Sequence, residues 1–207
     1  MDIVKEIIRA KVLGRGSGSG GGGDSGEVNQ LDAMIEGSIT EVKSNATSIR
    51  DNVFQSCSVL TAVSFSAATR IGGNAFRSCS ALTTANFPAA TSISQYAFYG
   101  CSALTTANFP AATSIGNSAF YNCKALMAII LRSETMATLK NTDAFSMTPI
   151  ISGTCYIYVP RALLSDTDST KDYRQASNWS TYAAQFRALE DYTVDGTTTG
   201  ALDESKI

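Results

Sequence analysis

The chain has 207 residues, of which 44% are hydrophobic and only 16% charged, and its formal net charge is −2. This balance excludes a strongly basic nucleic-acid-binding surface, and the absence of histidine excludes Ser-His-Asp and Cys-His catalytic systems and nearly every catalytic zinc site. We therefore expect no enzymatic activity, no cofactor and no metal.

Residues 1–13 place hydrophobic side chains at helical spacing, namely Ile3, Val4, Ile7, Ile8 and Val12. Charged residues interrupt them, so the segment does not match a secretory signal, and no run in the chain approaches the roughly 18 apolar residues of a membrane span. An isolated helix of this length is marginal, so we expect it to dock on a partner. Residues 14–27 are rich in glycine and serine and predict a flexible linker.

A 22-residue repeat follows and dominates the chain. Isoleucine, phenylalanine, cysteine and leucine each recur at this step, and residues 71–92 and 93–114 are identical at 17 of 22 positions. The recurring cysteines are Cys57, Cys79, Cys101 and Cys123, and the recurring phenylalanines are Phe54, Phe76, Phe98 and Phe120.

Each unit is expected to contain one strand and one helical segment. Ala85 and Phe87 lie two residues apart, which is strand spacing, and proline ends the strand at Pro88. Apolar residues between Ile93 and Cys101 then recur at helical spacing, which predicts two tight helical or 3₁₀ turns. Because one unit is unable to bury its apolar side alone, the units must stack as a solenoid.

The string I-G-x-x-A-F-x-x-C-x-x-L-T-x-x-x-F-P, which begins at Ile71-Gly72, resembles leucine-rich repeats of the BspA type. The resemblance implies a leucine-rich-repeat solenoid over residues 28–136, with short parallel strands and short helical or 3₁₀ turns. After the repeats, CYIYVP (155–160) predicts a strand, and residues 171–192 predict one or two helices with Tyr173, Trp179 and Tyr182 among their apolar contacts. The segment 137–192 is similar to α+β C-terminal caps of such arrays in bacteriophage structural proteins, and 193–207 is predicted to be a disordered tail.

The cysteine column has three interpretations: a metal site, disulfides between units, or buried reduced thiols. One thiol per unit gives no C-x-x-C pair, and side chains in one column point the same way, so we expect buried thiols that behave as small hydrophobic groups. The carboxylates Asp166, Asp168 and Asp172 lack the glycine and glutamate of an EF-hand loop, so we expect a solvated loop there.

Near-identical units differ only at positions predicted to face outward from the helical segment. Tyrosine, serine, glycine, asparagine and arginine alternate there, as they do in antibody contact loops. Recognition and neutral drift at exposed positions both explain this pattern. The candidate ligand-binding residues are Gln55, Asn74, Arg77, Gln95, Tyr96, Tyr99, Asn117, Tyr121 and Asn122.

The layout resembles bacteriophage head-fibre or tail-fibre proteins that carry BspA-type repeats. This implies a virion location, an N-terminus anchored in a larger assembly, a homo-oligomeric fibre, and a repeat domain that binds a cell-surface glycan or protein. The alternative is a bacterial or eukaryotic BspA-type interaction scaffold or surface adhesin that belongs to no virion.

Overall fold

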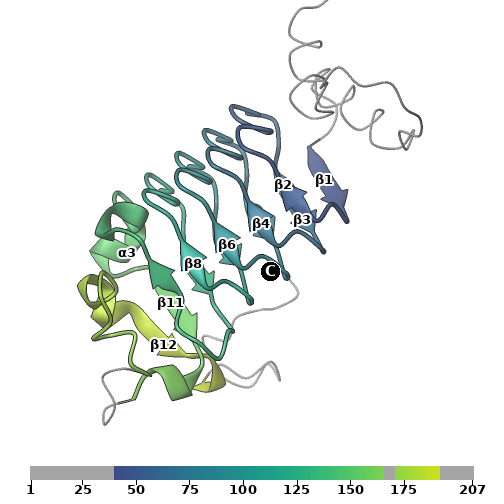
Figure 1. Cartoon of the computed structure of the whole chain (residues 1–207). Helices are drawn as coiled ribbons and strands as arrows, with labels where there is room; N and C mark the ends of the chain where they lie inside the picture. Colours follow the sequence, from purple (N-terminus) through teal and green to yellow (C-terminus); the bar gives the residue numbers. More distant parts are fainter. Residues whose placement is uncertain (1–39, 166–170, 192–207) are drawn as a thin grey trace, which may run out of the picture.

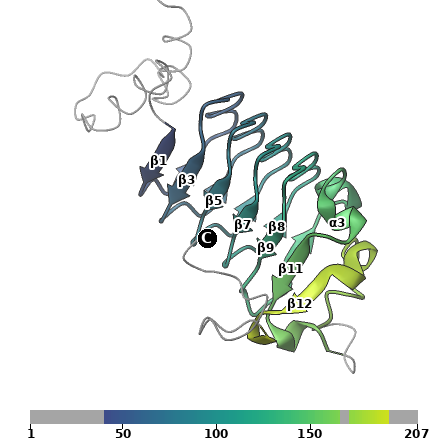
Figure 2. The same cartoon turned by 180° about the vertical axis from the view of Figure 1, so that it is seen from behind.

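The computed structural model describes residues 40–165 and 171–191, which form one row of stacked coils followed by a segment of short elements (Figures 1 and 2). The predicted anchoring helix 1–13, linker 14–27 and tail 193–207 lie outside the described residues. Within the described ranges, none of the helices has the length or the apolar character that crossing a membrane demands.

The main sheet is parallel and has seven strands in the order β1-β3-β5-β7-β9-β11-β12 (Figure 2). Each of its first five strands comes from one coil, which confirms the predicted solenoid. The bounds are β1 Glu41–Ser44, β3 Ala62–Phe65, β5 Thr84–Asn86, β7 Thr106–Asn108, β9 Ala128–Ile130, β11 Tyr156–Val159 and β12 Phe186–Ala188. Strand β11 confirms the strand expected over 155–160.

A second parallel sheet, which the sequence analysis did not predict, has the order β10-β8-β6-β4-β2. Each of its strands joins the residue just before the predicted helical segment to the residue that begins that segment. The second residue of each pair is the repeated isoleucine or its leucine equivalent, and it points inward. The bounds are β2 Ser48–Ile49, β4 Arg70–Ile71, β6 Ser92–Ile93, β8 Ser114–Ile115 and β10 Thr138–Leu139.

Two columns of stacked phenylalanines fill the space between the sheets and the turns. In the longer column the ring centroids of successive coils from Phe54 to Phe145 lie 5.1, 5.2, 5.3 and 5.4 Å apart. In the shorter column Phe65, Phe87 and Phe109 stack at 5.5 and 5.6 Å. Because Phe145 continues the longer column and β10 continues the second sheet, the coils extend beyond residue 136, where the sequence pattern fades.

In the described residues of 137–191, short 3₁₀ turns and strand β12 stand where the sequence predicts one or two helices over 171–192. The structure has the 3₁₀ turns η1 Thr142–Phe145, η2 Arg161–Leu163, η4 Ser180–Gln185 and η5 Leu189–Asp191, and one short helix, α3 Pro149–Ser152. Long-range hydrogen bonds override the helical pattern: Trp179 Nε1 donates to the Ala137 carbonyl at 2.6 Å, and Tyr182 donates to the Thr142 carbonyl.

The aromatic side chains of this segment cover the end of the longer phenylalanine column. Trp179 and Tyr182 contact the Phe145 ring with centroid distances of 5.8 and 5.5 Å, and Tyr173 packs edge-on against Trp179. Burying these rings shields the last coil from water. The role of the segment as a cap stays a prediction.

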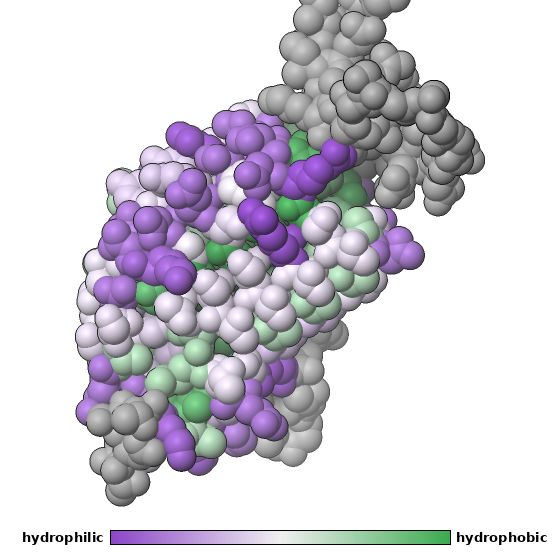
Figure 3. Space-filling view, viewed as in Figure 1, coloured by the Kyte–Doolittle hydropathy of each residue, from purple (hydrophilic) through white to green (hydrophobic). Residues whose placement is uncertain are grey.

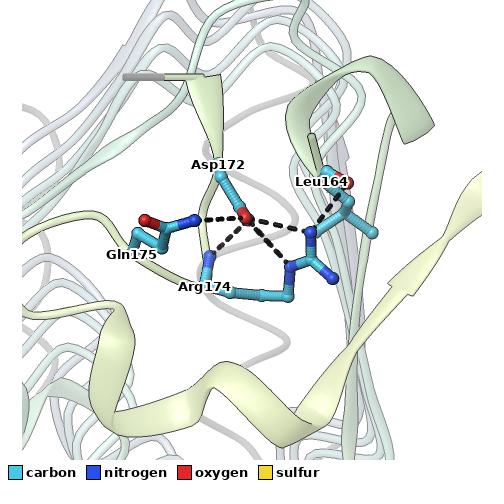
Figure 4. A network of polar contacts seen from close by, with 4 residues as sticks. All are labelled: Leu164, Asp172, Arg174 and Gln175. Atoms are coloured by element: carbon cyan, nitrogen blue, oxygen red, sulfur yellow. Dashed lines mark hydrogen bonds and ion pairs between the residues drawn. The ribbon is translucent and has the colours of Figure 1, made fainter. Parts of the chain in front are cut away.

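Asp172 corrects the expectation of a solvated acidic loop, because its side chain is buried and bonds to Arg174 and Gln175 (Figure 4). Burial by itself raises the pKa of this carboxyl group, but hydrogen bonds from Arg174 and Gln175 outweigh that effect and hold the pKa below its usual value. Arg174 also donates to the Leu164 carbonyl at 2.9 Å. The Asp172–Arg174 pair therefore links the chain around residue 172 to the chain at Leu164. Asp166 and Asp168 lie outside the described residues.

All five cysteines lie in the described part of the chain, and none of them forms a disulfide. The Sγ atoms of Cys79, Cys101 and Cys123 donate to the phenylalanine carbonyls of the preceding coil, Phe54, Phe76 and Phe98, at 3.0 to 3.2 Å. Burial raises the pKa of the Cys123 and Cys155 thiols to about 12 and the pKa of the other two buried thiols well above its ordinary value. The expected column of buried thiols is confirmed for Cys79, Cys101 and Cys123, whereas Cys57, in the first coil of the column, is half-buried.

This burial makes the thiols unreactive in the folded protein. At neutral pH, iodoacetamide should modify the half-buried Cys57 first and reach Cys79, Cys101, Cys123 and Cys155 only on unfolding, as peptide mass spectrometry would show. A reductant should leave the melting temperature unchanged. Burial raises the thiol pKa in the folded state, so the folded protein disfavours ionised thiols. The free energy of unfolding should therefore be unaffected by these thiols below pH 9.0, the ordinary thiol pKa, and should fall as the pH rises toward the folded-state pKa values.

The variant Cys101→Ala loses the carbonyl hydrogen bond and leaves a small cavity. It should lower the free energy of unfolding by about 1–2 kcal/mol in a denaturant titration. A melting temperature that fell when reductant was added to the wild type would contradict the column of reduced thiols.

Candidate functional site

The candidate site lies on the turns that connect the second sheet to the next strand of the main sheet. Their alternate N–H groups point along the stack: the N–H groups of Asn74, Phe76 and Ser78 donate to carbonyls of the next coil at 2.7 to 3.1 Å. The N–H groups of Arg77 and Cys79 close single turns within the coil. The segment is thus a series of turns with 3₁₀-type bonds, because bonding between coils takes the groups that a continuous helix needs.

The outward positions at which the units differ stack into columns from coil to coil, and two of these columns contain residues with left-handed backbone conformations. One column comprises Asn52, Asn74, Tyr96 and Ser118, with φ between 50° and 61°. The other comprises Ser56, Ser78, Gly100 and Asn122, with φ between 60° and 72°. Asparagine and glycine tolerate this conformation, so their presence has a backbone explanation that was missed in the sequence analysis. At Asn74 and Asn122 the residue type therefore does not by itself indicate recognition.

Tyr96 is the exception, because it is the only aromatic residue with positive φ in the described chain. A left-handed conformation costs a residue with a Cβ atom roughly 1–2 kcal/mol, and bulky residues rarely adopt it. The corresponding position of the preceding coil has Asn74, which tolerates that backbone better. Tyrosine thus occupies this position at a conformational cost, which points to a role outside the fold.

Tyr96 belongs to an aromatic cluster with Arg77, Tyr99 and Tyr121. The Tyr99 and Tyr121 rings, which hold equivalent positions in successive coils, stack with centroids 5.0 Å apart and planes inclined by 3°. Tyr96 meets the Tyr99 ring edge-on at 5.9 Å. The guanidinium carbon of Arg77 lies 4.9 Å from the Tyr99 centroid and 5.8 Å from that of Tyr96. All four side chains are half-buried, so part of each faces solvent.

The remaining candidate residues lie in different surroundings. Gln55, one coil before Arg77 in its column, is exposed, and so are Gln95 and Asn117. Asn122 is half-buried, and its Oδ1 atom is enclosed without a hydrogen-bond partner among the described residues. The structure therefore groups the three tyrosines with Arg77 and places Gln95 and Asn117 along a separate feature.

That feature is an open groove of about 540 Å³ beside the second sheet. Ile93 forms part of its floor, and uncharged polar side chains line its middle: Ser92, Ser94, Gln95, Ser114 and Asn117. Charged side chains stand at its ends, Asp51 and Arg70 at one and Lys140 at the other. On this face, pale residues of intermediate hydropathy cover most of the surface over the short strands, and strongly hydrophilic ones gather along the turns (Figure 3).

The sequence analysis missed the serines of the groove because it placed Ser92 and Ser114 in front of a helix. The signal was present in the repeated Thr-Ser-Ile triplets at 91–93 and 113–115, which have strand-like alternation over only three residues. Among the described residues, no group of three or more acidic or cysteine side chains is arranged to hold a metal ion.

A family model described as a BspA type leucine rich repeat region matches residues 36–155, in six copies. Among solved structures, a leucine-rich repeat protein of T. pallidum matches at 23% identity over 59% of this chain and 52% of that chain, with a TM-score of 0.45. A leucine rich cell surface protein of Faecalibacterium prausnitzii matches at 25% identity over 58% of this chain and 39% of that chain, with a TM-score of 0.44. The match thus spans about half or less of those proteins. No curated protein matches the chain.

The left-handed backbone at Tyr96 allows a test of whether this side chain lowers the stability of the fold. Tyr96→Asn places at this position the residue that the preceding coil uses, so it should raise the free energy of unfolding by about 1 kcal/mol in a denaturant titration. The reciprocal variant Asn74→Tyr should lower it by a similar amount. A loss of stability in Tyr96→Asn would show that the ring supports the fold and is not retained for another role.

Proposed function

Because the chain belongs to the BspA-type leucine-rich repeat family, we propose that it is a non-enzymatic adhesion module that recognises a surface through its turns. The observation that carries the proposal is the cluster of Arg77, Tyr96, Tyr99 and Tyr121 on coils whose buried residues are otherwise unchanged. The absence of histidine throughout the chain supports a non-enzymatic role.

The cluster has the chemistry of a binding hot spot. Tyrosine and arginine are enriched where interfaces concentrate their energy, and stacked rings lose little side-chain freedom on binding because their neighbours already hold them. The Arg77 guanidinium group lies over the face of the Tyr99 ring and adds a positive charge to the cluster. A flat ring surface with hydroxyl groups at its edge suits a sugar ring or a protein side chain equally.

The charge distribution narrows the class of ligand. Residues 78–123 contain no charged side chain, so the central coils offer hydroxyl groups, amides and aromatic rings. This favours a neutral glycan or a protein surface over a phosphate or another polyanion.

In the finer form of the proposal, the module is a bacteriophage virion fibre. Residues 1–13 would anchor it to a virion protein, residues 14–27 would act as the tether, and the domain 28–192 would project outward as part of a homo-oligomer. Several weak sites on one oligomer then act through avidity. The alternative is a scaffold or surface adhesin of the same family without a virion. Family membership and the tyrosine cluster support both forms equally.

Substituting the stacked rings of Tyr99 and Tyr121 tests the proposed binding role. Tyr99→Ala combined with Tyr121→Ala should weaken binding to the target cell surface by roughly 2 kcal/mol or more, because it removes the centre of the cluster. Binding would be measured by flow cytometry with labelled protein, and folding by circular dichroism. The control is Thr84→Ala combined with Thr106→Ala on the main sheet, which should leave binding unaltered. If the control lost binding and the tyrosine variant did not, recognition would belong to the sheet.

The virion form is tested separately. Deleting residues 1–13 should leave a folded domain that no longer enters particles, as mass spectrometry of purified particles would show, because the anchoring side chains Ile3, Val4, Ile7, Ile8 and Val12 are gone. Normal incorporation of the truncated chain would remove the anchoring role. Absence of the full-length chain from particles would leave the scaffold or adhesin as the function.

A further inference from the structure

We propose that the groove beside the second sheet binds a neutral oligosaccharide chain that runs along the stack of coils. This deepens the proposed function, on which it rests, by assigning a ligand class to a part of the molecule separate from the tyrosine cluster. The groove reaches from the coil of Asp51 to that of Lys140. At about 4.8 Å per coil, these four steps correspond to roughly 19 Å.

The polar groups that line the groove are available to a ligand. The side chains of Ser92, Ser94, Gln95, Ser114 and Asn117 all face it, and none of them makes a hydrogen bond to another described residue. This contrasts with the neighbouring threonines, since Thr91 and Thr113 donate to the carbonyls of Thr69 and Thr91 at 3.1 Å. Unused hydroxyl and amide groups in a row match the alternating donors and acceptors of a sugar chain.

A glycine keeps the groove open where the fold does not require one. At Gly72 and Gly116 a Cβ atom would lie 2.5 Å from backbone nitrogen of the preceding coil, so close packing explains both glycines. A Cβ atom at Gly73 would have its nearest contact at 3.6 Å, which is ordinary van der Waals distance, and its φ lies outside the left-handed region. The next coil has Gln95 at the position equivalent to Gly73, so the fold accommodates a long side chain there.

Charge and backbone pairing disfavour the other ligands. Arg70 lies 3.7 Å from Asp51, and Lys140 stands at the opposite end, so no pair of cations meets in the middle to hold an anion. The strands β4, β6 and β8 each pair on both sides, which leaves no edge on which a peptide could add as a strand. Hydroxyl and amide side chains thus remain as the means of recognition.

The test is isothermal titration of the full chain with four uncharged linear hexasaccharides: cellohexaose, maltohexaose, xylohexaose and chitohexaose. At least one should bind saturably. Gly73→Gln, which fills the groove with the side chain of the next coil, should weaken that binding about tenfold or more, and so should Gln95→Ala combined with Asn117→Ala. The control Ser66→Gln adds the same side chain at an exposed turn outside the groove and should bind as the wild type does.

Other outcomes would overturn the assignment. Failure of all four saccharides to bind, or unchanged binding by Gly73→Gln, would show that the groove is not a glycan site. Tighter binding of the neutral peptide (Ser-Asn)₅ than of any saccharide would assign the groove to a polypeptide instead. Because Tyr99→Ala with Tyr121→Ala reports on cell binding independently, the groove can fail while the proposed adhesion function stands.

Discussion

Every coil in this protein is held by its neighbours and not by itself. Its strands bond to those of the adjacent coils, the N–H groups of its turns alternate between its own carbonyls and those of the next coil, and its phenylalanines stack on the rings above and below. A single coil has few internal bonds and no core, so stability grows only as coils are added. This constraint fixes the inward isoleucine, alanine, phenylalanine, cysteine and leucine positions and leaves only the outward ones open to change.

The same constraint explains what the sequence predicts well. A residue that must stack on its own counterpart recurs at a strict step, so the solenoid, the main sheet and the thiol column follow from the 22-residue period. Of the helical or 3₁₀ turns that the apolar spacing predicts, the structure has the 3₁₀ type, and nothing in the spacing shows that alternate N–H groups bond between coils. The second sheet was missed because its strands have two residues each, and the alternation in the repeated Thr-Ser-Ile triplets is too short to indicate a strand.

Beyond the repeats, prediction fails because stabilisation is no longer periodic. Trp179 is placed by a bond to Ala137, 42 residues earlier in the chain, and Asp172 is buried by a local pair with Arg174. Contacts of this kind leave no pattern in the sequence. The candidate site likewise has one part that follows from the repeat and one part that does not. The Tyr99–Tyr121 stack follows from register alone, whereas the left-handed backbone at Tyr96 and the groove beside Gly73 depend on how the turns fold and were not predicted.

Register also determines what the outer surface can recognise. The rings of Tyr99 and Tyr121 lie 5.0 Å apart, close to the 5.2 and 5.3 Å of the buried rings Phe76, Phe98 and Phe120. The surface therefore carries the same repeat as the core, and any two outward residues in one column present their groups at that step. A ligand that makes the same contact on several coils must itself repeat at a matching distance, as a polymer does. A ligand without such a repeat is limited to positions where one coil departs from the others, and Tyr96 is such a position.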